Sequence, residues 1–119
     1  MRLGEVCLLT RDVPRLAGFY RKLLGVPSGG DGENREHQFV LARETALTVM
    51  RDDRPRKGQS AALAFTVEDM DEAYARVQAL GAEILEGPAK RPWGAVNMSF
   101  RDPDGNTVYL RRLTEESFP

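Results

Sequence analysis

Two stretches of the chain repeat one pattern of apolar and polar positions. Residues 9–26 and residues 65–82 each begin with an apolar run, continue through an Asp into mixed sequence, and end in Leu-Gly. In the mixed part, apolar residues recur every three or four positions, which is the spacing of an amphipathic helix. The alignment of the two stretches needs one gap. The pattern predicts that the chain is a tandem of two similar halves, each with one helix.

Residues at the ends of both stretches fix where these helices start and stop. Asp12 and Asp69 precede the helical spacing, and an Asp at this place accepts hydrogen bonds from the free amides of the first turn. Gly25 and Gly81 follow it, and a glycine ends a helix at low cost by adopting a left-handed conformation. We predict helices over 13–24 and 70–80.

Short apolar or alternating runs bracket both helices and predict strands. The segment 102–106, Asp-Pro-Asp-Gly-Asn, is a strong turn sequence. Arg43-Glu44 predicts a tight hairpin, and a Gly-rich loop covers 28–32. The predicted strands are 3–10, 37–42, 45–50, 61–67, 83–85, 95–100 and 107–112.

These elements predict an α+β fold built from two tandem β-α-β-β-β modules. We expect one domain over residues 1–119, with module one at 1–50, a polar linker at 51–60, module two at 61–113 and a loose tail at 114–119. A unit of about 50 residues buries too little apolar surface to be stable alone. We therefore expect the modules to form one curved, cup-like mixed sheet with the helices outside, whose hollow would suit a small molecule.

Composition narrows the class of protein further. Seventeen Lys and Arg balance 18 Asp and Glu, which lacks the basic excess of a nucleic-acid binder. No apolar stretch approaches the roughly 18 residues of a membrane span, and no apolar signal core follows Met1. With a single Cys and a single His, the chain offers no intrachain disulfide and no His cluster. We expect a cytoplasmic protein whose many Arg side chains mostly lie in solvent.

Several motifs in order carry a family resemblance: Val6 with Asp12, then Phe-Tyr-x-x-Leu-Leu-Gly at 19–25, Pro-Trp-Gly at 92–94, and Phe-Arg-Asp-Pro-Asp-Gly-Asn at 100–106. Together with the internal repeat, the chain resembles the glyoxalase, bleomycin-resistance and extradiol-dioxygenase superfamily (vicinal oxygen chelate proteins) over about residues 3–113. The resemblance implies paired β-α-β-β-β modules and a homodimer.

Catalytic members of that family hold a divalent metal with His, Gln or Glu on the strands that begin and end each half. By resemblance these positions fall on Glu5, Thr48, Ala62 and Tyr109. A catalytic site needs about three imidazole, carboxylate or thiolate ligands, and only Glu5 qualifies. An alternative metal site would be formed by Glu5, Cys7 and His37 across the cup. A buried Cys, however, more often serves as a small hydrophobic residue than as a metal ligand. We predict no metal and no cofactor.

Residues expected to line the hollow form the candidate ligand site. Trp93 would stack on a planar or cationic ligand, or would plug the mouth of the cup. Tyr109 would offer its hydroxyl to a ligand or serve as a core residue. Glu5 would be solvated, paired with Arg111 or matched to a cationic ligand. The predicted ligand-binding residues are Glu5, Cys7, His37, Phe39, Thr48, Met50, Trp93 and Tyr109.

The favoured function is therefore a metal-free protein that sequesters an aromatic or cationic small molecule, as antibiotic-resistance members of this family do. No nucleophile–base pair or paired carboxylates in the sequence indicate catalysis. The alternative functions are a metal-dependent lyase, isomerase or dioxygenase with atypical ligands, and a purely structural role.

Overall fold

A computed structural model describes most of the chain. The described residues are 3, 5–27, 32–41, 45–53, 62–92 and 94–113. Trp93, the Arg43-Glu44 turn, the tail at 114–119 and most of the predicted Gly-rich loop and linker lie outside them. The chain divides into two compact units, Met1–Arg56 and Lys57–Pro119, here called module one and module two. Among the described residues, no helix is long and apolar enough to cross a membrane.

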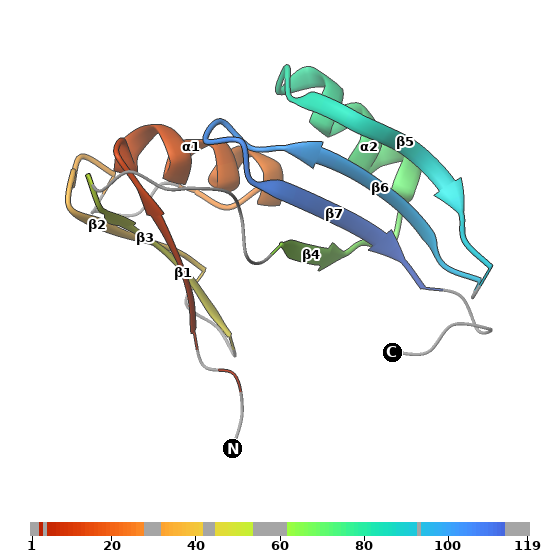
Figure 1. Cartoon of the computed structure of the whole chain (residues 1–119), viewed down its shortest axis with the longest axis horizontal. Helices are drawn as coiled ribbons and strands as arrows, with labels where there is room; N and C mark the ends of the chain where they lie inside the picture. Colours follow the sequence, from red (N-terminus) through yellow and green to blue (C-terminus); the bar gives the residue numbers. More distant parts are fainter. Residues whose placement is uncertain are drawn as a thin grey trace. The chain divides into compact units, whose positions relative to one another are not determined.

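Module one is a three-stranded mixed sheet with one helix beside it (Figure 1). The strand order is β1-β3-β2, in which β3 pairs parallel with β1 and antiparallel with β2. Because parallel neighbours require a crossover connection, α1 and β2 separate β1 from β3 in sequence. The elements are β1 (Glu5–Thr10), α1 (Val13–Leu24), β2 (His37–Leu41) and β3 (Ala46–Arg51).

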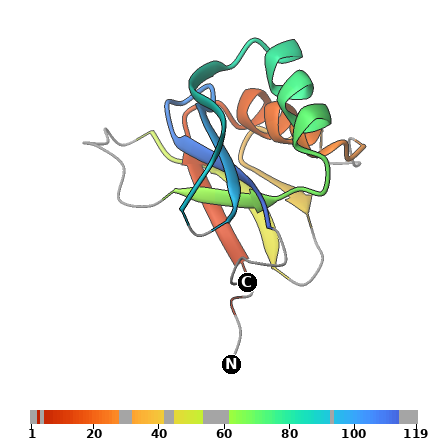
Figure 2. The ribbon, with the colours of Figure 1, turned by 90° about the vertical axis from the view of Figure 1, so that its right-hand side faces the viewer.

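Module two repeats this plan with one more strand. Its sheet has the order β4-β7-β6-β5, with β4 parallel to β7 and the other pairs antiparallel. Its helix α2 lies alongside the sheet in both views (Figures 1 and 2). The elements are β4 (Leu63–Thr66), α2 (Met70–Ala79), β5 (Glu83–Lys90), β6 (Val96–Arg101) and β7 (Thr107–Arg112).

The predicted α+β class and the two tandem modules with mixed sheets are confirmed. Module two has the full β-α-β-β-β order, and the described part of module one has β-α-β-β. The predicted helix ends are confirmed as well. The side chains of Asp12 and Asp69 accept from the amides of Arg15 and Glu72, 3.1 and 3.0 Å away, and Gly25 ends α1 with φ of +68°.

Each helix packs on one face of its own sheet through apolar side chains. In module one, Leu16, Ala17 and Tyr20 of α1 are fully buried, as is Val49 of β3. In module two the buried residues lie on α2, β6 and β7, and they are Met70, Ala73, Val77, Met98, Phe100, Val108 and Leu110. The opposite face of each sheet is free of its own module's helix.

Two strand boundaries predicted from the sequence need correction, and one Arg is an exception to the expectation that most Arg side chains lie in solvent. The strand predicted at 83–85 runs from Glu83 to Lys90, because β5 is an edge strand, where Pro88 costs no bond between strands. The third strand extends one residue into the predicted linker, to Arg51. Arg21 is not a surface residue. It is only 6% exposed and forms hydrogen bonds to β2.

Candidate functional site

The contact between Arg21 and β2 shows which side chains of that strand face α1. The Arg21 guanidinium donates to Gln38 Oε1, so Gln38 points toward the helix. Successive side chains of a strand alternate between faces, and His37 and Phe39 therefore point the other way. Gln38 pairs with Val49 in the register of β2 and β3, which places Val49 on the helix side and Thr48 and Met50 on the opposite side.

The register of the three strands then assembles most of the predicted site on that second face. Cys7, Thr48 and Phe39 lie side by side across β1, β3 and β2, and the neighbouring row contains Met50 and His37. Glu5 lies on the same face one step before Cys7. We call this surface the open face of module one, and its members are Glu5, Cys7, Leu9, His37, Phe39, Thr48 and Met50. Six of the eight predicted ligand-binding residues are among them.

One end of the open face is an accessible aromatic and thioether surface. Phe39 is 51% exposed and Met50 is 43% exposed. The ring of His37 meets the ring of Phe39 edge to face, with centroids 4.9 Å apart. Such rings bury a large area with few rotatable bonds, and a Met side chain adapts to irregular shapes. This end of the face is suited to stacking against a flat ligand.

The other end of the open face contains a fixed carboxylate. Thr48 is fully buried, and its hydroxyl donates to Glu5 Oε2 over 2.9 Å. Glu5 itself is exposed. The predicted cost of burying this carboxylate therefore does not arise, and the hydrogen bond holds an acidic group in a defined place beside the apolar surface. Arg111, the predicted partner, donates from Nε to Thr66 Oγ1 at 3.0 Å.

The family's metal does not fit the residues at the mapped positions. Glu5 supplies one carboxylate, already bonded to Thr48, while Ala62 has no donor atom and Tyr109 offers a phenol. The trio of Glu5, Cys7 and His37 fails on geometry. The register puts Glu5 and His37 four residues and two strands apart, or about 16 Å, too far for both to reach one ion. The described residues contain no group of three His, Cys, Asp or Glu able to hold a metal.

The two remaining predicted residues belong to module two. Tyr109 pairs with Ala64 and Ser99 in its sheet and is 38% exposed. It alternates with the buried Val108 and Leu110, so it lies on the face away from α2, and its predicted role in ligand binding stays a prediction. Trp93 lies outside the described residues, and its predicted stacking role stays a prediction.

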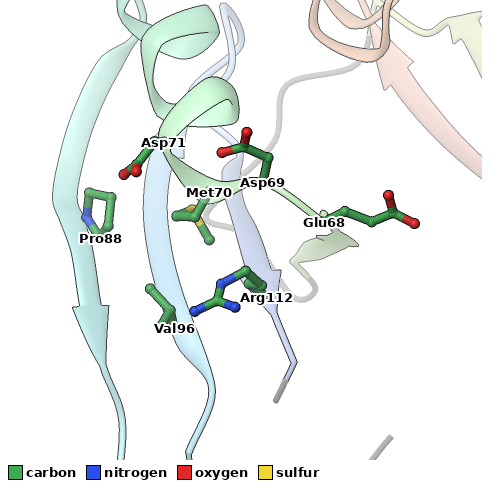
Figure 3. Close-up of a pocket in the computed structure, with 7 residues that line it drawn as sticks. All are labelled: Glu68, Asp69, Met70, Asp71, Pro88, Val96 and Arg112. Atoms are coloured by element: carbon green, nitrogen blue, oxygen red, sulfur yellow. The ribbon is translucent and has the colours of Figure 1, made fainter. Parts of the chain in front are cut away.

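Module two also has a pocket that sequence reasoning missed. It lies where α2 begins and has a volume of about 410 Å³ (Figure 3). The sequence of β7 contained an indication of this pocket. Arg112 follows Val108 and Leu110 at every second position, so its side chain lies on the same sheet face, toward α2. A charged residue on the face of a sheet that packs against a helix is usually paired with an opposite charge. The lining residues are Glu68, Asp69, Met70, Asp71, Pro88, Val96 and Arg112.

Comparison with known proteins identifies the family. The family model described as "Glyoxalase/Bleomycin resistance protein/Dioxygenase superfamily" matches residues 2–110. The chain belongs to this superfamily. As a member of the glyoxalase and bleomycin-resistance superfamily it has a curated relative and structural relatives that cover about 95% of its length. The protein described as "Uncharacterized protein YraH" of Bacillus subtilis (strain 168) is 27% identical over 127 aligned positions, covering 95% of this chain and 99% of the relative.

Solved structures of the superfamily share the fold at low identity. A glyoxalase/bleomycin resistance protein/dioxygenase family enzyme from Burkholderia phytofirmans PsJN superposes with a TM-score of 0.83 at 16% identity, over 96% of this chain and 100% of that one. A glyoxalase-related enzyme from Fulvimarina pelagi gives 0.77 at 21% identity, over 95% and 88%. At these identities the likeness describes the fold of the chain and leaves its ligand open.

Proposed function

We propose that this superfamily member is a metal-free binding protein that sequesters a small aromatic or cationic molecule in the cytoplasm. The observation that carries the proposal is the composition of the open face of module one. An exposed aromatic and thioether surface lies on the same sheet face as a carboxylate fixed by Thr48. This arrangement supports stacking and charge recognition, and neither requires a nucleophile or a metal.

The physical argument favours a flat cation over a neutral aromatic ligand. A planar ring that covers Phe39 and Met50 would remove their exposed apolar surface from water, at about 25 cal/mol per Å². A positive charge gains further attraction from the faces of aromatic rings. A positive charge is also attracted to the Glu5 carboxylate, whereas a neutral ligand is not and an anionic ligand would be repelled.

Binding of a planar cation tests the proposal. Isothermal titration with 1-methylquinolinium and with neutral quinoline, at a pH where quinoline is uncharged, should show tighter binding of the cation. Phe39→Ala should weaken binding by about 10-fold, since it removes the stacking surface. Glu5→Gln should weaken the binding of the cation while leaving the affinity for quinoline unchanged.

A matched control and a second measurement sharpen this test. Leu85→Ala removes a comparably exposed apolar side chain of module two, and it should leave both affinities within about two-fold. Failure of wild-type protein to bind either compound would count against sequestration of flat cations. Elemental analysis that finds about one tightly held Ni, Zn, Fe or Mn per chain, lost in Glu5→Gln, would favour the metal-dependent enzyme instead.

A further inference from the structure

The two ends of the open face of module one lie at a defined separation. Phe39 of β2 and Thr48 of β3 are direct partners in the register of their strands, and Cys7 of β1 continues that row on the other side of Thr48. Glu5 belongs to the next row toward one end of the sheet, and His37 belongs to the next row toward the other end. The carboxylate and the aromatic surface are therefore separated both across the sheet and along it.

The hydrogen bond from Thr48 limits how far the Glu5 carboxylate can lie from Phe39. Thr48 Oγ1 is 2.9 Å from Glu5 Oε2. The Cβ atoms of directly opposed residues, such as Thr48 and Phe39, are about 4.5–5.5 Å apart. The carboxylate is therefore no more than about 10 Å from Phe39 Cβ, on the far side of Thr48.

The stacking surface lies toward the opposite end of the face from Glu5. The ring of Phe39 contacts the ring of His37, and Met50 is the direct partner of His37 in the register. A ligand ring that covers the exposed parts of Phe39 and Met50 has its centre about 9 Å from the Glu5 carboxylate, given the spacing of strands and of residues along them. A positive charge within that ring does not reach hydrogen-bonding distance of the carboxylate.

The Glu5 carboxylate has room for a second partner. Among the described residues, Thr48 is the only side chain that bonds to it. An ionised carboxylate accepts at about four positions, and Glu5 is exposed. A charged N–H donor forms one of the stronger hydrogen bonds with such a group. The vacant positions of Glu5 therefore favour a ligand whose positive charge extends beyond its aromatic ring.

We propose that the ligand of the open face is a flat aromatic molecule with an ammonium group on a flexible arm. The ring lies on Phe39 and Met50, and the ammonium group donates to the Glu5 carboxylate. Because such a bond is about 2.8 Å long, the nitrogen lies about 6–7 Å from the centre of the ring, and an arm of three or four carbon atoms spans this distance. This inference rests on the function proposed above and adds where in the ligand the positive charge lies.

The test is a ligand series measured by isothermal titration at pH 7, where alkylamines are charged. Each compound has a 2-naphthyl ring and an arm of one to six carbon atoms that ends in either an amine or an alcohol. The ratio of amine affinity to alcohol affinity at equal arm length isolates the contribution of the charge from that of the apolar arm. This ratio should reach about 5-fold at three or four carbon atoms and stay below about two-fold at one, where the arm cannot span the gap.

Variants locate the charge and its support. Glu5→Gln should bring the ratio to about one at every arm length and leave the affinities for the alcohols unchanged. Thr48→Val removes the hydroxyl that holds the carboxylate, so the maximum should become lower and broader although the charge remains. Glu83→Gln, the control, removes the same charge from an exposed Glu of β5 and should change the ratio by less than about two-fold. The ligand series on unaltered protein decides the matter even where a variant folds poorly.

Other results overturn this inference and leave the proposed function intact. If amines and alcohols bind equally at every arm length, the ammonium group does not meet a carboxylate. A high ratio that is independent of arm length, or that survives Glu5→Gln, means that the charge meets another group. In each of these cases 1-methylquinolinium can still bind, and its binding tests the proposed function separately. Failure of 1-methylquinolinium and of every naphthyl compound to bind overturns both.

Discussion

Replacement of Gln38 by Leu would remove the polar connection between α1 and the strand that carries His37 and Phe39. Gln38 is completely buried. Its Oε1 accepts from the Arg21 guanidinium, and its Nε2 donates to the carbonyl oxygens of Gly32 and Asn34, 3.1 and 2.8 Å away. Leu has a similar volume, so the substitution removes these bonds without opening a large cavity.

The expected loss of stability follows from the three bonds. A hydrogen bond from a charged donor contributes about 1.5–3 kcal/mol, and each neutral bond contributes about 0.5–1.5 kcal/mol. The greater hydrophobicity of Leu returns about 1 kcal/mol. The free energy of unfolding should fall by about 1.5–5 kcal/mol. For a chain of this size that is a decrease in Tm of about 6–20 °C.

Urea and thermal unfolding followed by circular dichroism measure this loss. The control is Gln78→Leu, which changes an exposed Gln on α2 and should alter stability by less than about 0.5 kcal/mol. If Gln38→Leu proves as mild as this control, the buried polar network does not contribute to the stability of module one, and the reasoning is refuted.

Three further predictions concern the turn, a helix cap and assembly. Asp102→Ala should lower stability by about 2–4 kcal/mol, because the buried carboxylate accepts from the amides of Asp104 and Asn106 and from Asn106 Nδ2. Asp104→Ala in the same turn should cost far less, and equal losses would contradict this account. Asp69→Ala should cost about 1 kcal/mol and Asp69→Asn only a few tenths, as measured by thermal unfolding. Sedimentation velocity at about micromolar concentration should show the homodimer that the family resemblance implies, and a monomer there would contradict it.

The parts of the fold that depend on local chemistry could be predicted from the sequence. Asp12 and Asp69 bond the first turns of α1 and α2 as expected, since a cap involves residues three apart. Alternation along single strands correctly grouped Thr48 with Met50 and His37 with Phe39. These inferences need no knowledge of which strand lies next to which.

Features that depend on distant segments could not be predicted. The register that places Cys7 beside Thr48 is set by a parallel pairing of strands about 40 residues apart in sequence, on which local patterns have no bearing. The burial of Arg21 could not be predicted from the sequence because its partner Gln38 lies on another element. The pocket at Arg112 was missed for the same reason, since three strands and a helix start supply its walls.

The outer strand of module two has a consequence for how the protein behaves in a crowded solution. β5 forms one edge of its sheet, and its pairing with β6 shifts register twice between Ile84 and Ala89. Pro88 has no N–H to offer an incoming chain. A long, regular edge strand invites edge-to-edge aggregation, and an interrupted one discourages it. Pro88, which lies in the part of β5 that the sequence did not predict as strand, therefore helps to keep neighbouring molecules from extending the sheet.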